Sequence, residues 1–330
     1  MKFLVVGAGS IGKRHLRNLR ALGETDLLVL RRPESKAGAA DLEKEVGAAT
    51  VYDLEAAFAA RPDAVVVANP TSLHVETALA AARRGVHVFM EKPLSHSLAG
   101  VDELAGLVAA GGVVFFIGFM MRYHPCVATM KRLADEGAIG RVMGARFSFG
   151  SYLPDWHSWE DYRGGYAARR DLGGGAVLTL THEIDLALHF LGEPRRVLAL
   201  AGRRSDLEVQ TEDYAEVLVE HASGAIGSVH VDYCQRAYNR TAEVYGTEGT
   251  LAWNWDAKAV RLRRGKDDAR DFPEPEGYDL NAMYLDELRD FLACLRAGRG
   301  GPLDLALARR NLAVALAAIR SSAEGKAVDL

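Results

Sequence analysis

Four short segments of this 330-residue chain bring together residue types that can do chemistry. The first is a G-x-G-x-x-G pattern at Gly7, Gly9 and Gly12, directly after an apolar run. Glycines at this spacing allow a tight turn, a close approach of the backbone to a pyrophosphate and close packing of a helix on a strand. We therefore expect a dinucleotide-binding loop that includes Ser10 and Ile11. A glycine-rich turn without a ligand is the alternative.

The second segment is the pair Arg31 and Arg32, which follows the apolar run 27–30. An NAD enzyme usually has an acidic residue at this point of the chain to bind the ribose 2′-hydroxyl. Guanidinium groups instead bind phosphate oxygens with two parallel hydrogen bonds, which suits a 2′-phosphate. We therefore expect NADP as the cofactor, with NAD as the alternative. The two arginines could also be solvated, or one could stack on the adenine.

The third segment, Glu91-Lys92-Pro93, follows the apolar run 86–90. A loop at the carboxyl end of a parallel strand lies where ligands bind in such sheets. A lysine there can donate a hydrogen bond to a substrate hydroxyl and stabilise the oxyanion of a forming carbonyl. A salt bridge between Lys92 and Glu91 is the alternative interpretation.

The fourth segment is the helical pattern 176–191, in which His182, Asp185 and His189 recur at i, i+3 and i+7. This spacing predicts that all three lie on one helical face. A neutral histidine can take the proton of an alcohol, so His182 is the candidate general base or acid, and Asp185 could orient its ring. A structural histidine is one alternative. A metal site is another, but no further ligand pattern accompanies these residues, so we expect no metal.

The loop 151–171 contains two of the four tryptophans and three tyrosines. Trp156 and Tyr162 could stack on a sugar ring, and Arg163 could bind a carboxylate or phosphate of the substrate. The same composition is typical of contacts between subunits, and the sequence leaves both interpretations open.

The elements that position these segments are predicted from the order of strand and helix patterns, which changes near residue 120. In residues 1–120, apolar strands alternate with helical segments, which predicts a parallel sheet in a Rossmann domain. The expected strands are 3–6, 27–30, 64–68, 86–90 and 113–117. Residues 121–330 predict an α+β substrate-binding and oligomerisation domain on a largely antiparallel open sheet. Its expected strands are 141–153, 195–204, 213–221, 225–236, 240–247 and 250–264, and its helices 176–191, 279–297 and 303–322.

Composition excludes several classes of partner. The net charge of −4 argues against nucleic acid, which usually binds basic proteins. The uncharged run 104–121 is divided by Gly111 and Gly112, which favours a helix followed by a strand and excludes a membrane span. Three widely spaced cysteines form no disulfide framework, so we expect a cytoplasmic protein.

Taken in order along nearly the whole chain, the motifs resemble the Gfo/Idh/MocA family of glucose-fructose oxidoreductase and inositol dehydrogenase. The motifs that carry this resemblance are Gly7–Gly12 with His15, Asn69–His74, Glu91–Pro93, Gly118–Pro125, Gly173–Gly175, His182–Asp185 and Gly246–Thr250. The resemblance implies a Rossmann domain joined to an α+β domain whose open sheet mediates a homodimer or homotetramer. It also implies hydride transfer between the nicotinamide and a secondary alcohol or carbonyl of a carbohydrate-like substrate: a sugar, sugar acid, nucleotide sugar or cyclitol.

By position, the resemblance assigns several residues to the nicotinamide half of the cofactor: Asn69, Thr71, His74 and Glu91. It assigns Lys92 to the substrate, with the Lys92–Pro93 peptide bond cis as in relatives. It assigns Arg122 and Tyr123 to the junction of cofactor and substrate.

The chain departs from the family one helical turn before His182. Many members have an aspartate there, whereas this chain has Leu178 and Thr179. A proton relay would then run through Asp185 or water. Two other functions stay open: a redox-neutral glycosidase-type enzyme with tightly bound NAD, and a non-catalytic nucleotide-sensing protein.

Overall fold

The computed structural model describes residues 1–32 and 39–330, which form two compact units. Unit 1 consists of Met1–Met120 and Asn281–Arg309. Unit 2 consists of Met121–Leu280 and Arg310–Leu330. Each unit is built around its own sheet.

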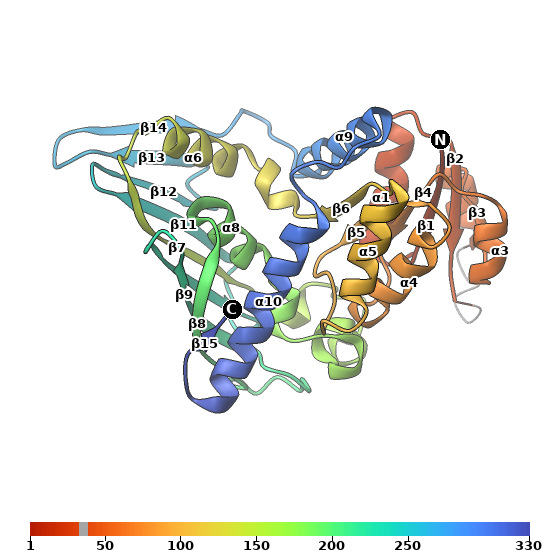
Figure 1. Cartoon of the computed structure of the whole chain (residues 1–330). Coiled ribbons are helices and arrows are strands. Elements are labelled where there is room, and N and C mark those ends of the chain that lie inside the picture. Colours follow the sequence, from red (N-terminus) through yellow and green to blue (C-terminus); the bar gives the residue numbers. More distant parts are fainter. Residues whose placement is uncertain (33–38) are drawn as a thin grey trace. The chain divides into compact units, whose positions relative to one another are not determined.

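Unit 1 contains a parallel sheet of six strands in the order β3-β2-β1-β4-β5-β6 (Figure 1). This order is that of the Rossmann fold, which confirms the predicted class. The strands are β1 Lys2–Val6, β2 Asp26–Leu30, β3 Ala49–Val51, β4 Ala64–Val67, β5 His87–Glu91 and β6 Phe115–Gly118. The central strands are apolar along their length because helices cover both faces, so every residue of β4 is buried.

The helices of unit 1 are α1 Ser10–Ala21, α2 Ala39–Val46, α3 Leu54–Ala59, η2 Thr71–Leu73, α4 His74–Ala82, α5 Val101–Gly111 and α9 Asn281–Ala297. The sequence assigned the segment that forms α9 to the second domain, but in the structure it packs with unit 1. The reason is aromatic packing: the Phe291 ring centroid lies 5.5 Å from that of Phe89 and 5.8 Å from that of Phe116. Periodicity shows that such a helix is amphipathic, but not which sheet it covers.

Unit 2 contains a sheet of nine strands in the order β14-β13-β12-β11-β7-β10-β9-β8-β15. Every pair is antiparallel except β7 with β10, which confirms the largely antiparallel sheet. The strands are β7 Val142–Gly150, β8 Pro194–Gly202, β9 Tyr214–His221, β10 Ile226–Asp232, β11 Asn239–Gly246, β12 Thr250–Asn254, β13 Ala259–Arg263, β14 Ala269–Pro273 and β15 Val328–Asp329.

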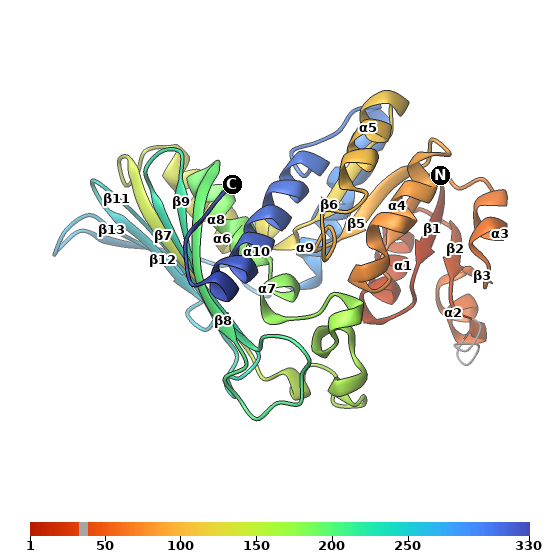
Figure 2. The same cartoon turned by 60° about the horizontal axis from the view of Figure 1, so that its bottom comes forward.

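Buried and exposed residues alternate along this second sheet, as along β9, where Ala215, Val217 and Val219 are buried. The buried face lies against helices α6 (Pro125–Asp135) and α8 (His182–Leu191) (Figure 2). No helix among the described residues of unit 2 covers the other face. The remaining helices are η3 Met120–Tyr123, η4 Leu153–Asp155, η5 Tyr162–Gly164, η6 Tyr166–Ala168, η7 Arg170–Leu172, α7 Ala176–Thr179 and α10 Leu305–Glu324, the last of which spans both units.

Two predicted elements are wrong in their extent. The strand expected over 250–264 is a hairpin of β12 and β13, because Lys258 turns the chain with a φ of 48° and the Asn254 Oδ1 accepts from the Ala257 N–H at 2.7 Å. The sequence carries no glycine or proline at this turn, so the usual signal is missing. The helix expected over 176–191 is two helices, α7 and α8, which are separated at Leu180 and Thr181.

None of the helices among residues 1–32 and 39–330 is both long enough and apolar enough to span a membrane.

Candidate active site

The turn after β1 has the geometry that its glycine spacing predicts. Gly7 has a φ of 104°, and a Cβ there would lie 2.5 Å from the main-chain oxygen of Ala68. A Cβ on Gly12 would lie 2.0 Å from the main-chain oxygen of Gly7. A Cβ on Gly9 would meet no described atom within 4 Å. The turn is therefore closed on the protein side and open at the second glycine, where a ligand can approach the backbone.

Helix α1 begins at Ser10, and its N-cap residue is Gly9, which has no side chain to accept from the first turn. The first main-chain N–H groups of a helix, here including those of Ser10 and Ile11, have no acceptor within the helix. The helix dipole adds partial positive charge at the same place, and the first turn carries no acidic side chain. These donors and the open space at Gly9 fit the pyrophosphate of a dinucleotide.

The two arginines follow β2 at the same edge of the sheet, because Leu30 is the register partner of Val6. The Arg31 N–H donates to the main-chain oxygen of Val51 at 3.0 Å. The side chain of Arg31 is half-buried and that of Arg32 is exposed. Residues 33–38 lie outside the described residues.

The chain after β4 carries Asn69, Thr71 and His74. The Asn69 Nδ2 donates to the Thr77 Oγ1 at 3.0 Å. Among the described residues, no protein group donates to the buried Asn69 Oδ1, which leaves an acceptor that fits the amide of a nicotinamide. Thr71 is buried and begins η2.

His74 is buried and makes two contacts with main-chain oxygens. Its Nδ1 lies 2.8 Å from the Pro93 oxygen, and its Nε2 lies 2.9 Å from the Asn69 oxygen. Burial lowers the pKa of His74, whereas the two carbonyl contacts and the nearby Glu91 oppose that shift. The ring therefore joins the chain after β4 to the chain after β5.

The chain after β5 carries the lysine motif, and the predicted cis Lys92–Pro93 bond is confirmed. Glu91 is buried, and its Oε1 lies 2.6 Å from the Nε2 of His15 in α1. Burial is the largest effect on the pKa of Glu91 and acts to raise it, but the contact with His15 and the nearby Lys92 and His74 together lower the pKa of this carboxyl. Lys92 itself is half-buried.

In unit 2, His182 is the first residue of α8 and is 5% exposed. Asp185 lies one turn further on and is fully buried. Its Oδ2 accepts from the Arg122 Nε at 2.8 Å, and its Oδ1 accepts from the Arg122 Nη2 at 2.7 Å. Burial raises the pKa of Asp185, and Arg122 opposes the rise. The sequence predicted that Asp185 could orient the His182 ring, but both of its carboxylate oxygens accept from Arg122. Tyr123, the residue after Arg122, is half-buried.

Two further contacts fix the start of α8. The Arg240 Nε in β11 donates to the Glu183 Oε1 at 2.9 Å, and both side chains are buried. The Asn311 Nδ2 in α10 donates to the main-chain oxygen of Thr181 at 3.1 Å. His182 therefore follows a residue held by α10 and precedes one held by β11.

At the place of the family aspartate, Leu178 and Thr179 are both buried in α7. Neither side chain can ionise.

The loop 151–171 folds into a series of short turns, in which each candidate side chain already has a partner. The Trp156 Nε1 donates to the Ser151 Oγ at 2.6 Å. Tyr162 accepts from the Glu208 N–H at 3.1 Å, and Arg163 bonds Asp161 and Glu208. Because the pairs of Arg163 are exposed, a ligand can exchange with them at small energetic cost.

His124, Cys126 and Glu274 form the one group among the described residues whose donor atoms could hold a metal. However, the His124 Nδ1 accepts from the Cys126 N–H at 3.3 Å, which caps α6. The neutral ring then carries its proton on Nε2, which faces the Glu274 carboxylate at 3.4 Å. The arrangement is that of a helix cap with a carboxylate partner.

Comparison with known proteins identifies the family. Residues 1–119 match the GFO_IDH_MocA oxidoreductase family with an NAD-binding Rossmann fold, and residues 127–252 match the GFO/IDH/MocA C-terminal domain. The chain belongs to the Gfo/Idh/MocA family. The expected resemblance is thus confirmed, and the member described here is an NAD(P)-dependent oxidoreductase that acts on CH–OH groups.

Three curated relatives are similar to this family member. Levoglucosan dehydrogenase of Pseudarthrobacter phenanthrenivorans is 30% identical over 59% of the chain, and the alignment spans 56% of that enzyme. The scyllo-inositol 2-dehydrogenase (NAD(+)) of Bacillus subtilis is 28% identical over 99% of the chain and 95% of its own length. D-xylose 1-dehydrogenase (NADP(+)) 2 of Haloferax volcanii is 29% identical over the full length of both chains.

Among solved structures, GenD2 from gentamicin A biosynthesis in complex with NAD is 28% identical, with a TM-score of 0.85 over 100% of this chain and 96% of that one. The levoglucosan dehydrogenase complex with NADH has a TM-score of 0.88 at 24% identity and shares the fold, over 100% of this chain and 98% of that one. The names of the relatives include both NAD and NADP, so the family does not settle the choice of dinucleotide.

Within unit 1, the structure brings most predicted site residues together. Within unit 2 it pairs Arg122 with Asp185, whereas Trp156, Tyr162 and Arg163 bond to Ser151, Asp161 and Glu208. The glycine loop, Arg31 and the residues after β4 and β5 share the carboxyl edge of one sheet. Sequence reasoning missed the partners His15, Thr77, Glu183 and Arg240. His15 stands in a motif of the resemblance, but Glu91 lies 76 residues away, and no local pattern joins the two.

Proposed function

We propose that this family member oxidises or reduces a secondary carbinol carbon of a sugar, sugar acid, nucleotide sugar or cyclitol. The observation that carries the proposal is the buried His15–Glu91 contact. It joins the helix of the dinucleotide loop to the residue before Lys92, so that cofactor binding and the candidate substrate lysine belong to one bonded assembly in unit 1.

When bound, the nicotinamide accepts or donates the hydride. We assign the remaining work to the chain's own residues. In the direction of oxidation, Lys92 donates a hydrogen bond to the reacting oxygen, and His182 takes the hydroxyl proton as the hydride leaves the same carbon. In reduction, His182 returns that proton. Asp185, which the sequence assigned to proton transfer, holds Arg122 in this proposal, because both of its oxygens accept from that guanidinium.

Asn69 and Thr71 are proposed to contact the nicotinamide half of the cofactor. Tyr123 is proposed to contact the substrate next to it. The free acceptor at the Asn69 Oδ1, defined among the described residues, supports this role for Asn69.

We propose that NADP is preferred over NAD, because Arg31 and Arg32 follow β2 at the edge that carries the glycine loop. The double variant Arg31→Ala/Arg32→Ala should weaken NADP binding at least tenfold and change NAD binding less than twofold. Arg289→Ala, which removes an exposed arginine paired with Asp286 on α9, is the matched control. Equal losses for both dinucleotides would overturn the preference.

The substrate class is proposed from the loop 151–171, where Trp156 and Tyr162 offer aromatic surface and Arg163 offers a cation. An acidic or nucleotide-linked sugar would replace the exposed Asp161 and Glu208 as partners of Arg163. Arg163→Gln should therefore raise KM for anionic sugars more than for neutral ones.

One observation favours a second candidate function. Leu178 and Thr179 stand where relatives with a full proton relay have an aspartate, and this fits a redox-neutral enzyme that keeps its NAD bound, or a nucleotide sensor. A dehydrogenase accumulates reduced nicotinamide in proportion to product. A redox-neutral enzyme forms product without net reduction, and a sensor binds dinucleotide without turnover.

We further propose a homodimer or homotetramer that forms through the uncovered face of the unit 2 sheet. Four apolar side chains on that face are at least 44% exposed: Leu198 (47%), Leu200 (68%), Leu218 (46%) and Ile226 (44%). Leu198 and Leu218 are register partners on adjacent strands, so their side chains form one continuous patch.

A cytoplasmic location is proposed because the three cysteines are all free, which suits a reducing compartment.

The experiment is a substrate panel with NAD and NADP, read at the absorbance of reduced nicotinamide. The panel contains pentoses, hexoses, sugar acids, nucleotide sugars and cyclitols. For any active substrate, Lys92→Met and His182→Ala should each lower kcat at least a hundredfold. Lys131→Met, which breaks a surface pair with Asp135, should keep kcat within twofold. Retention of kcat by His182→Ala would remove that residue from the mechanism.

A further inference from the structure

Lys92 lies between Glu91 and Pro93, and each of these two residues contacts a histidine from a helix of unit 1. Before it, Glu91 accepts from His15 of α1 across 2.6 Å. After it, the main-chain oxygen of Pro93 lies 2.8 Å from the Nδ1 of His74, the first residue of α4. Both histidine side chains are at most 2% exposed. The two contacts therefore act on the lysine from opposite directions along the chain.

The second nitrogen of His74 extends this arrangement to the chain after β4, because its Nε2 lies 2.9 Å from the Asn69 main-chain oxygen. A carbonyl oxygen only accepts, so the neutral ring, which has one N–H, donates to one of the two oxygens, and only the protonated ring donates to both. Both ring nitrogens thus face the protein backbone. His74 has no further donor or acceptor with which to bind a nicotinamide.

The His15 ring is itself fixed by packing. It lies edge-on to the Phe89 ring, with the centroids 5.0 Å apart. Phe89 belongs to β5, the strand that leads into the motif, and it also packs on Phe291. Movement of Glu91 would therefore break a buried hydrogen bond. It would also leave a buried carboxylate without a partner beside apolar side chains, which costs free energy.

We infer that His15 and His74 are positioning residues that hold Lys92 from both sides, so that its ammonium group meets the substrate in one fixed place. The inference rests on the proposed function of Lys92 and adds what sets the position of that lysine. It also gives His74 a role in place of the nicotinamide contact that the resemblance implied.

Holding the residues on both sides of a lysine matters because its side chain is long and has several rotatable bonds. When the Glu91 carboxylate and the Pro93 carbonyl are both held, the main chain at Lys92 is restricted on both sides. A displacement of about 1 Å at a reacting group can cost about a hundredfold in rate. Loss of either contact should therefore act on kcat more than on the binding of the dinucleotide.

The test uses the full chain and four variants: His15→Phe, His15→Gln, His74→Phe and His74→Gln. Phenylalanine keeps the ring and removes both nitrogens, whereas glutamine keeps one N–H donor. The matched control is His221→Phe in unit 2, because His221 is also buried and its Nδ1 lies 2.9 Å from the main-chain oxygen of Gly192. Three quantities are measured. The dissociation constant for the reduced dinucleotide comes from its fluorescence, and kcat and KM come from steady-state kinetics. The rate at which an amine-reactive reagent labels Lys92 comes from mass spectrometry.

We expect kcat to fall at least tenfold in both phenylalanine variants, with KM and the dinucleotide dissociation constant changing less than threefold. The glutamine variants should recover part of the lost kcat. The Lys92 labelling rate should change at least threefold in the phenylalanine variants, relative to the other lysines, and stay within twofold in His221→Phe. An unchanged labelling rate and kcat in either pair would overturn the inference for that histidine.

The labelling rate separates this inference from the proposed function. If the parent protein turns over no substrate of the panel, the proposed function fails, and the labelling rate still decides whether the histidines hold Lys92. If the parent is active but the phenylalanine variants keep its kcat and its labelling rate, the inference fails alone.

Discussion

Asp185 illustrates, at the scale of single residues, how the polar groups of the candidate site are bonded within their own unit. Its type and spacing from His182 predict proximity on one helical face, and α8 contains both residues. However, its two oxygens accept from Arg122, 63 residues earlier in the chain. The residue was predictable from the sequence, but its partner was not, because tertiary contacts leave no trace in local spacing.

Removal of Arg122 should destabilise the protein strongly. Arg122→Met leaves the Asp185 carboxylate buried without its cation, which costs about 3–5 kcal/mol in comparable cases. Urea unfolding at pH 8 measures the loss. The double variant Arg122→Met/Asp185→Leu should recover most of it, because no buried charge remains.

The pH dependence provides the control for this pair. Without Arg122, the pKa of Asp185 should rise further, because the only cause that opposes the effect of burial is removed. The penalty in Arg122→Met should therefore shrink as the pH falls and the carboxyl takes a proton. Equal penalties in the single and double variants would contradict the account of a buried ion pair.

At the scale of elements, the sequence predicted the long apolar strands and the glycine loop, because their signals are local, but it did not predict β3, β14 or β15. Apolar runs mark strands that are buried on both faces, as for β4 and β5. The break between α7 and α8 was missed because the residues at the break, Leu180 and Thr181, include no glycine or proline to signal it. The hairpin of β12 and β13 was missed because a lysine adopts its left-handed turn conformation.

Two glycines of the loop should respond differently to the same substitution. Gly9→Ala adds a methyl group to open space at a φ of −69°, so stability should stay within about 0.5 kcal/mol while dinucleotide binding weakens at least tenfold. Gly12→Ala places a Cβ 2.0 Å from the Gly7 oxygen, so both stability and binding should fall. Thermal unfolding and dinucleotide fluorescence measure the two effects. Unchanged binding in Gly9→Ala would exclude this loop as the pyrophosphate site.

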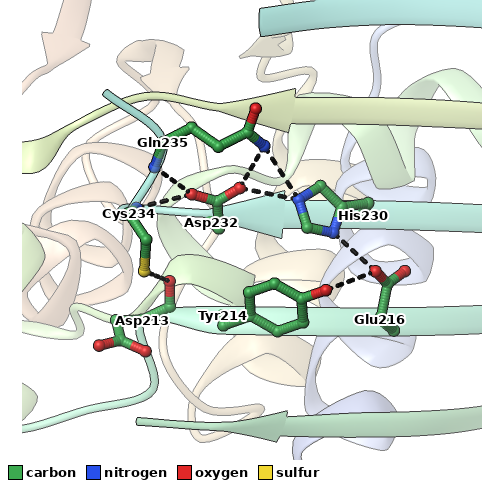
Figure 3. A network of polar contacts seen from close by, with 7 residues as sticks. All are labelled: Asp213, Tyr214, Glu216, His230, Asp232, Cys234 and Gln235. Carbon is green, nitrogen blue, oxygen red and sulfur yellow. Dashed lines mark hydrogen bonds and ion pairs between the residues drawn. The ribbon is translucent and has the colours of Figure 1, made fainter. Parts of the chain in front are cut away.

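The uncovered face of the unit 2 sheet carries a polar network that should make stability depend on pH (Figure 3). The His230 Nδ1 lies 2.8 Å from the Glu216 Oε1, and its Nε2 lies 2.7 Å from the Asp232 Oδ2. Tyr214 also donates to Glu216, and Gln235 donates to Asp232. The contacts with Asp232 and Glu216 raise the pKa of His230, although its partial burial opposes the rise.

Because this pKa is raised on folding, the protonated ring contributes stability below the unfolded value of about 6.5, and the contribution is lost as the pH rises through the folded value. The parent should therefore lose stability relative to His230→Gln as the pH rises above about 6.5. Urea unfolding across this range gives the difference. A difference independent of pH would contradict the assignment of a charged ring between two carboxylates.

At the scale of the whole molecule, the ordered motifs predicted the family, and two matching family regions confirm it. The sequence did not predict that the segment Asn281–Arg309 returns to unit 1, because Phe291 packs on Phe89, which lies 202 residues earlier in the chain.

The apolar patch of unit 2 should decide the oligomeric state. Leu200→Glu together with Leu218→Glu places charges on both strands of the patch and should shift a dimer or tetramer toward the monomer. Light scattering after size-exclusion chromatography measures the mass. The exposed Trp159→Ala is the control on a different surface, and its mass should not change. A monomeric parent protein would contradict assembly through this face.

Transfer of a labelled hydride tests the central claim most directly. A substrate found active in the panel is prepared with deuterium at its secondary carbinol carbon and mixed with the oxidised dinucleotide and the protein. The account predicts that the reduced nicotinamide gains the deuterium, one per molecule of ketone formed. Product without reduced nicotinamide, or reduced nicotinamide without deuterium, would contradict it.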